Sequence, residues 1–450
     1  MAGSSSKCPH HALQVEVSAH AEDAGFRRAP ADKRASAATS STSRPGKVKD
    51  ATSSEPEDDL SFTFPGPLVL PDDDLALDPS YSPQSLRSWL REKERNAVTD
   101  DRKTIYVARV PSIAPELSVM RSWIGPKLKA RSGAARGRGN GANAPDPPQS
   151  AHIREYLEAF YHGLRVEEFA AGLEFVPWSS KTPKGAPTFV GLRSGTLCTR
   201  IRTRPCPDGT FARQLNLSDI LDAAIELLPE DAYAFLLLVD HDLYEDDDDD
   251  FCCGRAYGGS RVAVVSSARY HPDLDEEAGI DHEHMWPTSH CAAYVRTICG
   301  ATITTKKKAP PLSQPTNIQS TPMGAAIEVS RAKSSVPLNA YGLWLSRLLR
   351  TASHELGHCV ALDHCVYYAC VMQGTAGMAE DVRQPPYLCP VCVEKVSRAV
   401  LNVNPGLDKR QYLADRYTAL SKFCRKWLDV GMLAGYHAWL ESRLRQLQAS

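Results

Sequence analysis

Three histidines and one glutamate between residues 354 and 364 have the spacing of a metal site. His354 and His358 are four residues apart, so on a helix both imidazoles project from one face, one turn apart. Two histidines in this arrangement bind zinc, and the intervening Glu355 acts on zinc-bound water. His364 follows at the spacing of a third ligand. We therefore predict a catalytic zinc site held by three imidazoles, with its fourth position open to water.

Hydrolysis of an amide bond by water, without a covalent acyl-enzyme, is the reaction that such a site would support. Zinc lowers the pKa of its bound water toward ~7. Glu355 would take the proton from this water and pass it to the leaving amine, while zinc would stabilise the oxyanion of the tetrahedral intermediate. The alternative is a zinc-stabilised binding protein with little or no turnover. Glu355 favours the enzyme, because a pure binding module has no need of a general base beside the metal.

A second metal site is predicted from four cysteines that follow these histidines. Cys389 and Cys392 form a CxxC pair, and Cys365 and Cys370 are suited to complete the set. Four thiolates make a closed, structural zinc site, which would hold the segment after the third histidine in place. The alternatives are a disulfide or a redox-active CxxC, but a redox motif needs a thioredoxin-like strand before it, and the preceding PPYL is not one. We therefore expect two zinc ions, one catalytic and one structural.

Two further groups of potential ligands are not expected to bind a metal. The segment 281–291 is rich in imidazoles, but Pro287 interrupts it and no two of its histidines are four residues apart. A second group lies in the polar, aperiodic N-terminal stretch. It consists of Cys8, His10 and His11.

The elements that would position these sites follow from the hydrophobic pattern. An apolar run before His354 predicts that this residue lies on a long helix beginning near residue 343. Upstream, strands and helices alternate, which predicts an α/β layered core with a mixed or parallel sheet. The strands are expected at 104–110, 173–178 and 233–239, and the helices at 152–164 and 220–228.

Two later segments complete the predicted domain. The strand RVAVVSSARY at 261–270 is expected at the edge of the sheet near the active-site helix. In zinc peptidases of this shape, such an edge strand pairs with extended substrate. Residues 408–448 predict one or two amphipathic helices that cap the domain, since no heptad pattern persists that would favour a coiled coil.

Composition divides the chain into three parts. Residues 1–60 are expected to be a disordered tail, because they cannot bury enough apolar surface to offset chain entropy. Residues 61–400 would form the zinc peptidase domain, and 401–450 a helical extension. Flexible insertions are expected at 125–150 and 301–340. The basic character of the first could suit nucleic acid, but it lacks the aromatic residues that stack on bases, so nucleic-acid binding is not expected.

Net charge and hydropathy exclude several classes of partner. The formal net charge of −2 gives no overall attraction to nucleic acid or to an anionic membrane. The longest apolar runs, such as 234–240, are too short to span a bilayer, and the N-terminus lacks the apolar region of a secretory signal. The 13 cysteines are an odd number, and their tightest cluster has zinc-ligand spacing, which favours metal ligation over disulfides. We expect an intracellular protein of the cytoplasm or nucleus that acts on peptides or proteins; its oligomeric state is not predicted.

In these motifs the sequence resembles the archaemetzincins, a branch of the metzincin zinc metallopeptidases. The pattern of that family is HExxHxxGxxHC, followed by a second cysteine, a methionine and a CxxC pair. The matching residues here are His354, Glu355, His358, His364, Cys365, Cys370, Met372, Cys389 and Cys392. The resemblance covers roughly residues 100–400. It implies a metzincin-like α/β fold with a mixed twisted sheet, one catalytic and one structural zinc, and a peptidase that is aminopeptidase-like or acts on small peptides. It also implies that Met372 lies beneath the zinc ligands.

One position departs from the family pattern. Ala361 occupies the place of the glycine that lets the helix end in a left-handed turn, so that the third histidine returns to the metal. An alanine in this conformation costs roughly 1 kcal/mol or somewhat more. We therefore expect a strained turn at Ala361, which would loosen the hold on His364 unless the two zinc sites fix the turn.

Overall fold

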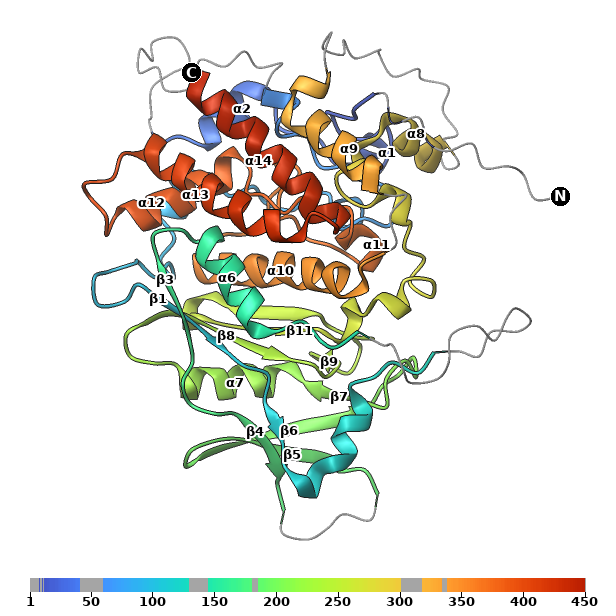
Figure 1. Ribbon diagram of the computed structural model, residues 1–450, viewed down its shortest axis with the longest axis vertical. Coiled ribbons are helices and arrows are strands. Elements are labelled where there is room, and N and C mark those ends of the chain that lie inside the picture. The colour runs from blue at the N-terminus through green and yellow to red at the C-terminus, as the bar shows by residue number, and fades with distance from the viewer. Residues whose placement is uncertain are drawn as a thin grey trace, which may run out of the picture.

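The computed structural model describes most of the chain, and its elements stack in layers. Figure 1 shows a helical layer at one end of the molecule, a sheet beneath it, and a second sheet at the other end. The described residues are 8, 10, 12–40, 60–128, 145–179, 185–300, 318–333 and 338–449. Most of the insertion predicted at 125–150 and the first part of the one at 301–340 lie outside these residues.

A five-stranded mixed sheet lies at the centre. Its order is β10-β11-β8-β1-β3, and neighbouring strands are parallel except for β10, which runs antiparallel to β11. The strands are β1 (Thr104–Ala108), β3 (Arg165–Glu168), β8 (Ala232–Val239), β10 (Gly254–Tyr257) and β11 (Val262–Ser266). β8 is buried along its whole length. Its uninterrupted apolar sequence follows from this position, because other layers cover both faces of the sheet.

The strand order corrects one prediction. The strand predicted at 261–270 is β11, but β11 lies between β10 and β8, so its assignment as the edge strand was wrong. The edge next to the active-site helix belongs to β10. This strand was missed because it has only four residues and a mixed polar sequence, GRAY, which is too short for a periodic pattern.

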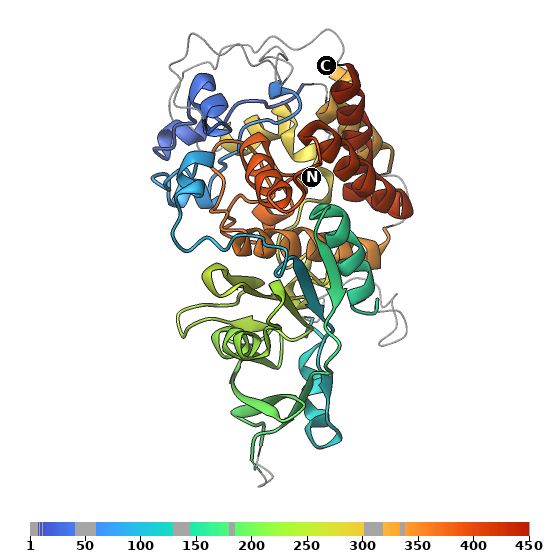
Figure 2. The same cartoon turned by 90° about the vertical axis from the view of Figure 1, so that its left-hand side faces the viewer.

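A second, six-stranded sheet forms the far end of the molecule and was not predicted as a separate layer. Its order is β2-β4-β5-β6-β7-β9. The strands are β2 (Ser112–Ile113), β4 (Glu174–Pro177), β5 (Phe189–Ser194), β6 (Leu197–Pro205), β7 (Arg213–Asn216) and β9 (Leu243–Tyr244). Helix α7 (Leu217–Leu227) lies between the two sheets (Figures 1 and 2), and its buried residues belong to a core separate from the one around the active-site motif.

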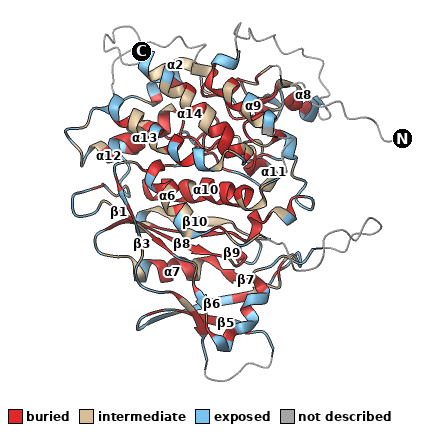
Figure 3. Cartoon of the chain, in the orientation of Figure 1, coloured by how far each residue is buried: buried red, intermediate tan, exposed pale blue. Residues whose placement is uncertain are grey.

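Helix α10 (Ala340–Cys359) carries the histidine motif through the centre of the molecule. Asn339 caps its N-terminus by accepting a hydrogen bond from the backbone N–H of Gly342. The helix is buried along most of its length (Figure 3), since it packs between the five-stranded sheet and the helical layer. Ala361, two residues beyond the helix, has a φ of 61°. The left-handed turn predicted at this alanine is therefore confirmed.

The C-terminal part of the chain supplies most of the helical layer. Its helices are α9 (Pro322–Lys333), α12 (Pro390–Leu401), α13 (Lys409–Cys424) and α14 (Gly431–Ala449). α9 lies within the stretch predicted as a flexible insertion at 301–340. This part is folded against α14, because apolar residues such as Met323 and Ala326 enter the main core.

These layers confirm the predicted fold class: an α/β domain with a mixed sheet, an active-site helix and a helical C-terminal extension. The extension is anchored by Trp439, which is fully buried in the main core. None of the helices in the described part of the chain is both long and apolar enough to cross a membrane.

Residues 12–40, here called the N-terminal arm, depart from the disordered tail expected for 1–60. The arm contains α1 (His20–Asp23) and α2 (Ala31–Ala37). Its few apolar side chains, among them Leu13 and Phe26, are buried against the domain. The composition argument fails here because a preformed surface can order a segment that could not form a core by itself.

Candidate active site

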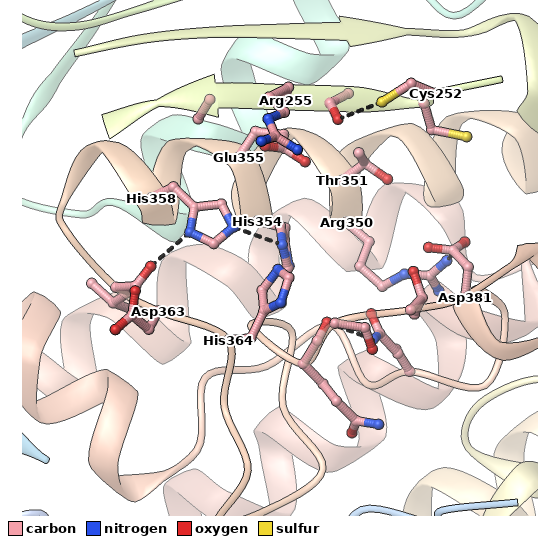
Figure 4. Close-up of a pocket in the computed structure, with 18 of the residues that line it drawn as sticks. Cys252, Arg255, Arg350, Thr351, His354, Glu355, His358, Asp363, His364 and Asp381 are labelled. Carbon is pink, nitrogen blue, oxygen red and sulfur yellow. Dashed lines mark hydrogen bonds and ion pairs between the residues drawn. The ribbon is translucent and has the colours of Figure 1, made fainter. Parts of the chain in front are cut away.

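The three histidines predicted to bind zinc meet at a cavity (Figure 4). One ring nitrogen from each of His354, His358 and His364 lies within 4.8 Å of the other two. The Nε2 atoms of His354 and His358 are 3.0 Å apart. Nitrogens bound to one tetrahedral zinc lie roughly 3.3 Å apart, given Zn–N bonds of ~2.0–2.1 Å. His354 and His358 are therefore spaced as two ligands of one zinc ion with only a small adjustment, and His364 lies within 4.8 Å of both.

The hydrogen bonds of two of these imidazoles show that both Nε2 atoms carry lone pairs. His354 Nδ1 is 2.7 Å from the carbonyl oxygen of Val371, and His358 Nδ1 is 2.7 Å from that of Leu362. A carbonyl oxygen only accepts, so each Nδ1 carries the proton. Burial, reinforced by the neighbouring imidazole of His364, lowers the pKa of His358 to about 4, and burial lowers the pKa of His354 well below its usual value. Both rings are neutral, and their lone pairs face each other as in a pair of metal ligands.

The left-handed turn at Ala361 brings His364 back to this pair, and a glutamine clamps the turn. Gln84 Nε2 donates to the carbonyl of Ala361 (3.0 Å), and Gln84 Oε1 accepts from the N–H of Asp363 (3.2 Å). The buried Lys395 donates from Nζ to the same glutamine oxygen (2.6 Å). Side-chain hydrogen bonds from distant segments therefore oppose the strain of an alanine in this conformation.

Gly374 makes room for the ring of His364. A Cβ added at Gly374 would lie 2.8 Å from His364 Nδ1 and would overlap Asp74 Oδ2. Burial lowers the pKa of His364, and the negative charge of Asp74 opposes this shift. A carboxylate beside a ligand imidazole helps to fix the orientation of the ring.

Met372 supports the ligand helix from below. It is fully buried, and its Sδ approaches Gly357 so closely that any side chain at that glycine would collide with it. The carbonyl of Met372 accepts a hydrogen bond from the N–H of Cys365 (2.7 Å). The methionine therefore connects α10 to the segment that holds the cysteines.

Glu355 faces the cavity beside strand β10 (Figure 4). A Cβ added at Gly254 of β10 would lie 3.3 Å from Glu355 Cγ. Burial raises the pKa of Glu355 to about 8, and the positive charge of Arg255 opposes the rise. A carboxyl group whose pKa is close to neutrality is suited to transfer protons.

The cavity in front of these groups has a volume of about 820 Å³ and is large enough for several residues of a peptide. β10 lines one side of it, and the segment 373–378 also contributes. Within the described residues β10 pairs on one side only, with β11. Its free edge can therefore form main-chain hydrogen bonds with an extended chain.

The four predicted zinc-ligand cysteines form a second, buried cluster. Their sulfurs all lie within 4.8 Å of one another, and none of the four residues is more than 4% exposed. The sulfurs of Cys365 and Cys389 are 3.5 Å apart, well beyond the ~2.05 Å of a disulfide. Cys389 caps α12 and Cys392 lies in its first turn, where the helix dipole favours a thiolate. The donor set fits a closed, four-coordinate zinc site.

The residues that position the histidines were not found from the sequence. They are Asp74, Gln84, Gly374 and Lys395. No local sequence pattern identifies Asp74, Gln84 or Lys395, because each lies far along the chain from the atoms that it contacts. Gly374 is visible as a glycine close to the motif, but its need for space follows only from the folded structure.

Comparison with known proteins agrees with this geometry. A family model described as Peptidase family M54 matches residues 325–398, which include both ligand clusters. Archaemetzincin-2 of Macaca fascicularis is 25% identical over 372 residues, covering 81% of this chain and 74% of that protein. Archaemetzincin-2 of Homo sapiens is 25% identical over 371 residues, with the same coverage. The crystal structure of archaemetzincin from Methanopyrus kandleri aligns with 67% of this chain and 97% of its own, at 17% identity and a TM-score of 0.31. The family match and the two relatives confirm the predicted resemblance to the archaemetzincins and support a zinc metallopeptidase.

Proposed function

We propose that this protein hydrolyses peptide bonds with water, using zinc bound by His354, His358 and His364 and Glu355 as the general base. The observation that carries the proposal is the pair of facing Nε2 lone pairs, 3.0 Å apart, beside a carboxyl group in an open cavity. Neutral imidazoles are a donor set that zinc prefers. When bound, zinc would supply a water of lowered pKa and polarise the scissile carbonyl.

The chain's own groups would bind the substrate, orient the ligands and move the proton. β10 would align an extended peptide across the cavity through its backbone. The carbonyls of Val371 and Leu362 would hold His354 and His358 with Nε2 turned inward. Glu355 would take the proton of the attacking water and return it to the leaving amine.

A free amino terminus is the substrate feature that the cavity would favour. Five carboxyl side chains line it in addition to the general base: Glu92, Glu94, Asp250, Asp363 and Asp381, of which Asp381 is paired with Arg350. Their negative charge would attract an ammonium group, which supports the aminopeptidase-like or small-peptide activity implied by the resemblance. We expect peptides with a free amino terminus to have a higher kcat/KM than their acetylated forms. Equal values for both forms would contradict this preference.

The buried cysteine cluster would hold a second zinc ion with a structural role. The four ligand cysteines are not joined in disulfides, and thiolate ligation requires that they stay reduced. We therefore propose that the protein acts in a reducing compartment, the cytoplasm or the nucleus.

The decisive test of catalysis compares the wild type with Glu355→Gln. This variant keeps the three imidazoles, so we expect its zinc content and thermal stability to match those of the wild type. Loss of the general base should lower kcat by ~10²- to 10⁴-fold. Glu116→Gln, which changes an exposed carboxyl outside the cavity, is the matched control and should leave kcat unchanged.

A zinc-stabilised binding protein predicts a different result. Neither the wild type nor Glu355→Gln would then cleave any member of a peptide library. Equal cleavage by the two proteins would also contradict the role assigned to Glu355.

A further inference from the structure

A third group of metal-ligating side chains lies outside both clusters. Cys8, His10 and Cys291 each offer one ligand atom, and these three atoms lie within 4.8 Å of one another. His10 also belongs to a second group of this kind, with His284 and Glu283. The two groups share His10 and bring the N-terminus onto the imidazole-rich segment, although neither stretch was expected to bind a metal by itself. Among the described residues His284 is not grouped with the two sulfurs, so a shared ion requires its imidazole to move toward them.

The polar contacts of the two histidines, a hydrogen bond for His284 and an ion pair for His10, leave one nitrogen of each available. His284 Nδ1 is 2.7 Å from Asp281 Oδ2, and His10 Nε2 is 3.5 Å from Glu283 Oε1. A carboxylate only accepts, so these two nitrogens carry the protons. The remaining nitrogens, His284 Nε2 and His10 Nδ1, are buried and find no hydrogen-bond partner among the residues that the structure describes. A carboxylate on one nitrogen and a free lone pair on the other is typical of a metal-ligating histidine.

The sulfur of Cys8 accepts a backbone hydrogen bond in the same way as one sulfur of the buried cysteine cluster, that of Cys370. It accepts a hydrogen bond from the backbone N–H of His10, two residues further on. In the cysteine cluster, the N–H of Met372 likewise donates to Cys370 Sγ (3.5 Å), two residues before it. Burial and the hydrogen bond with Cys291 raise the pKa of the Cys8 thiol to about 11, and the hydrogen bond from the His10 N–H opposes this rise. The sulfurs of Cys8 and Cys291 are 3.1 Å apart, which is longer than the ~2.05 Å of a disulfide.

We propose that Cys8, His10, His284 and Cys291 bind a further zinc ion in a closed, structural site. Two thiolates and two imidazoles are an established tetrahedral donor set for structural zinc. The two thiolates also balance the charge of the ion, so that it can be held in a partly buried position. The site requires both segments, because the N-terminus and residues 281–291 each contribute one sulfur and one imidazole.

The ion would fasten the N-terminal arm to the domain. Immediately after the site, Gln14 N–H donates to the carbonyl of His290 (2.8 Å). Further along the arm, Arg28 Nε donates to the carbonyl of Tyr367 (3.2 Å). Tyr367 lies two residues after Cys365 in the buried cysteine cluster. The arm therefore connects the proposed site to the segment that follows the catalytic histidines, and metal binding at its start would stabilise this connection.

Elemental analysis of the purified full-length chain tests the site. The double variant Cys8→Ser/His10→Ala removes two ligands near the N-terminus, where substitution leaves the main core intact. Cys198→Ser, which changes an exposed cysteine, is the control. We expect the double variant to bind one zinc ion per chain fewer than the wild type and the control. His284→Ala should produce the same loss from the other segment.

Limited proteolysis gives a second readout that needs no activity. We expect the N-terminal arm of the double variant to be cleaved faster than that of the wild type, and the wild type to become equally sensitive once a chelator has removed its zinc. Equal zinc content in the double variant and the wild type would overturn the proposal. A Cys8–Cys291 disulfide, found by peptide mapping without reductant, would also overturn it. The zinc count does not depend on hydrolysis, so this result is independent of the test on Glu355.

Discussion

The histidine cluster and the cysteine cluster lie side by side in the chain but have opposite surroundings. Both fall within residues 354–392 and meet at the bond between His364 and Cys365. The histidines line a cavity of about 820 Å³, whereas the four cysteines are buried. Three ligands facing a cavity leave a coordination position for water and substrate, while four buried ligands leave none. If the two clusters have the proposed catalytic and structural roles, burial as well as ligand type separates them.

The closed cluster also positions the open one. The backbone between Cys370 and the CxxC pair includes Val371, whose carbonyl orients His354 (2.7 Å). The N–H of Val371 is held in turn by the carbonyl of Tyr387 (2.9 Å), two residues before Cys389. Loss of the cysteine cluster should therefore disturb the histidines, whereas loss of a histidine should leave the cysteines in place.

The largest effect is expected from Cys392→Ser. Loss of one thiolate should release the structural zinc and lower the free energy of unfolding by on the order of 3–5 kcal/mol, because zinc binding to a structural site contributes directly to folding. Activity should fall as well, since the carbonyl that orients His354 loses its support. Denaturant unfolding and zinc analysis would measure both effects.

His358→Ala provides the contrast. It should release only the catalytic zinc and abolish hydrolysis, while the free energy of unfolding changes by about 1 kcal/mol. If Cys392→Ser were as stable as the wild type, or if His358→Ala destabilised the protein more than Cys392→Ser, the division into a structural and a catalytic cluster would be wrong.

An intermediate effect is expected from Gly374→Ala. The new methyl group would collide with His364 Nδ1 and with Asp74, so the ring must turn away from the site. Zinc affinity at the histidine cluster should fall by roughly 10- to 100-fold, while the cysteine cluster keeps its zinc. Competition with a chromophoric chelator would measure this.

Gly377→Ala is the matched control for that substitution. A Cβ at Gly377 meets nothing within 4 Å, and its φ of −175° is extended backbone that alanine adopts freely. Equal losses of affinity in both variants would show that the collision with His364 is not the cause.

The smallest effect is expected from Ala361→Gly. A glycine adopts the left-handed conformation without the steric cost of a Cβ, so stability should rise by up to about 1 kcal/mol. Zinc should also bind slightly more tightly, because the turn at residue 361 determines the position of the ligand His364. Thermal unfolding of the zinc-loaded protein would detect the change. No change in either quantity would show that the clamp by Gln84 and Lys395 already removes the strain.

The parts of the fold and the site that could be predicted are those in which residues follow a regular local spacing. The strands at 104–110 and 233–239 and the helix that carries His354 are long periodic segments, and they correspond to β1, β8 and α10. The strand predicted at 173–178 corresponds to β4. The rest of the second sheet was missed because strands such as β6 (LCTRIRTRP) mix charged and apolar residues, and because several of the other strands are very short. The predictions of disorder for the N-terminal arm and of a flexible insertion around α9 were wrong. Both were based on composition, but both segments are ordered by contacts with the rest of the protein.

The sequence by itself determined which potential ligands are present and how they are spaced, and therefore the predicted zinc chemistry and the resemblance to the archaemetzincins. Spacing along a helix or within a CxxC pair is set by local backbone geometry, so it can be read without a fold. Only the tertiary structure decided that β10 is the edge strand and that Gln84 clamps a turn 277 positions away. It also placed Cys8 beside Cys291, 283 positions apart. Contacts over such separations depend on how the layers pack, and no short-range pattern encodes them.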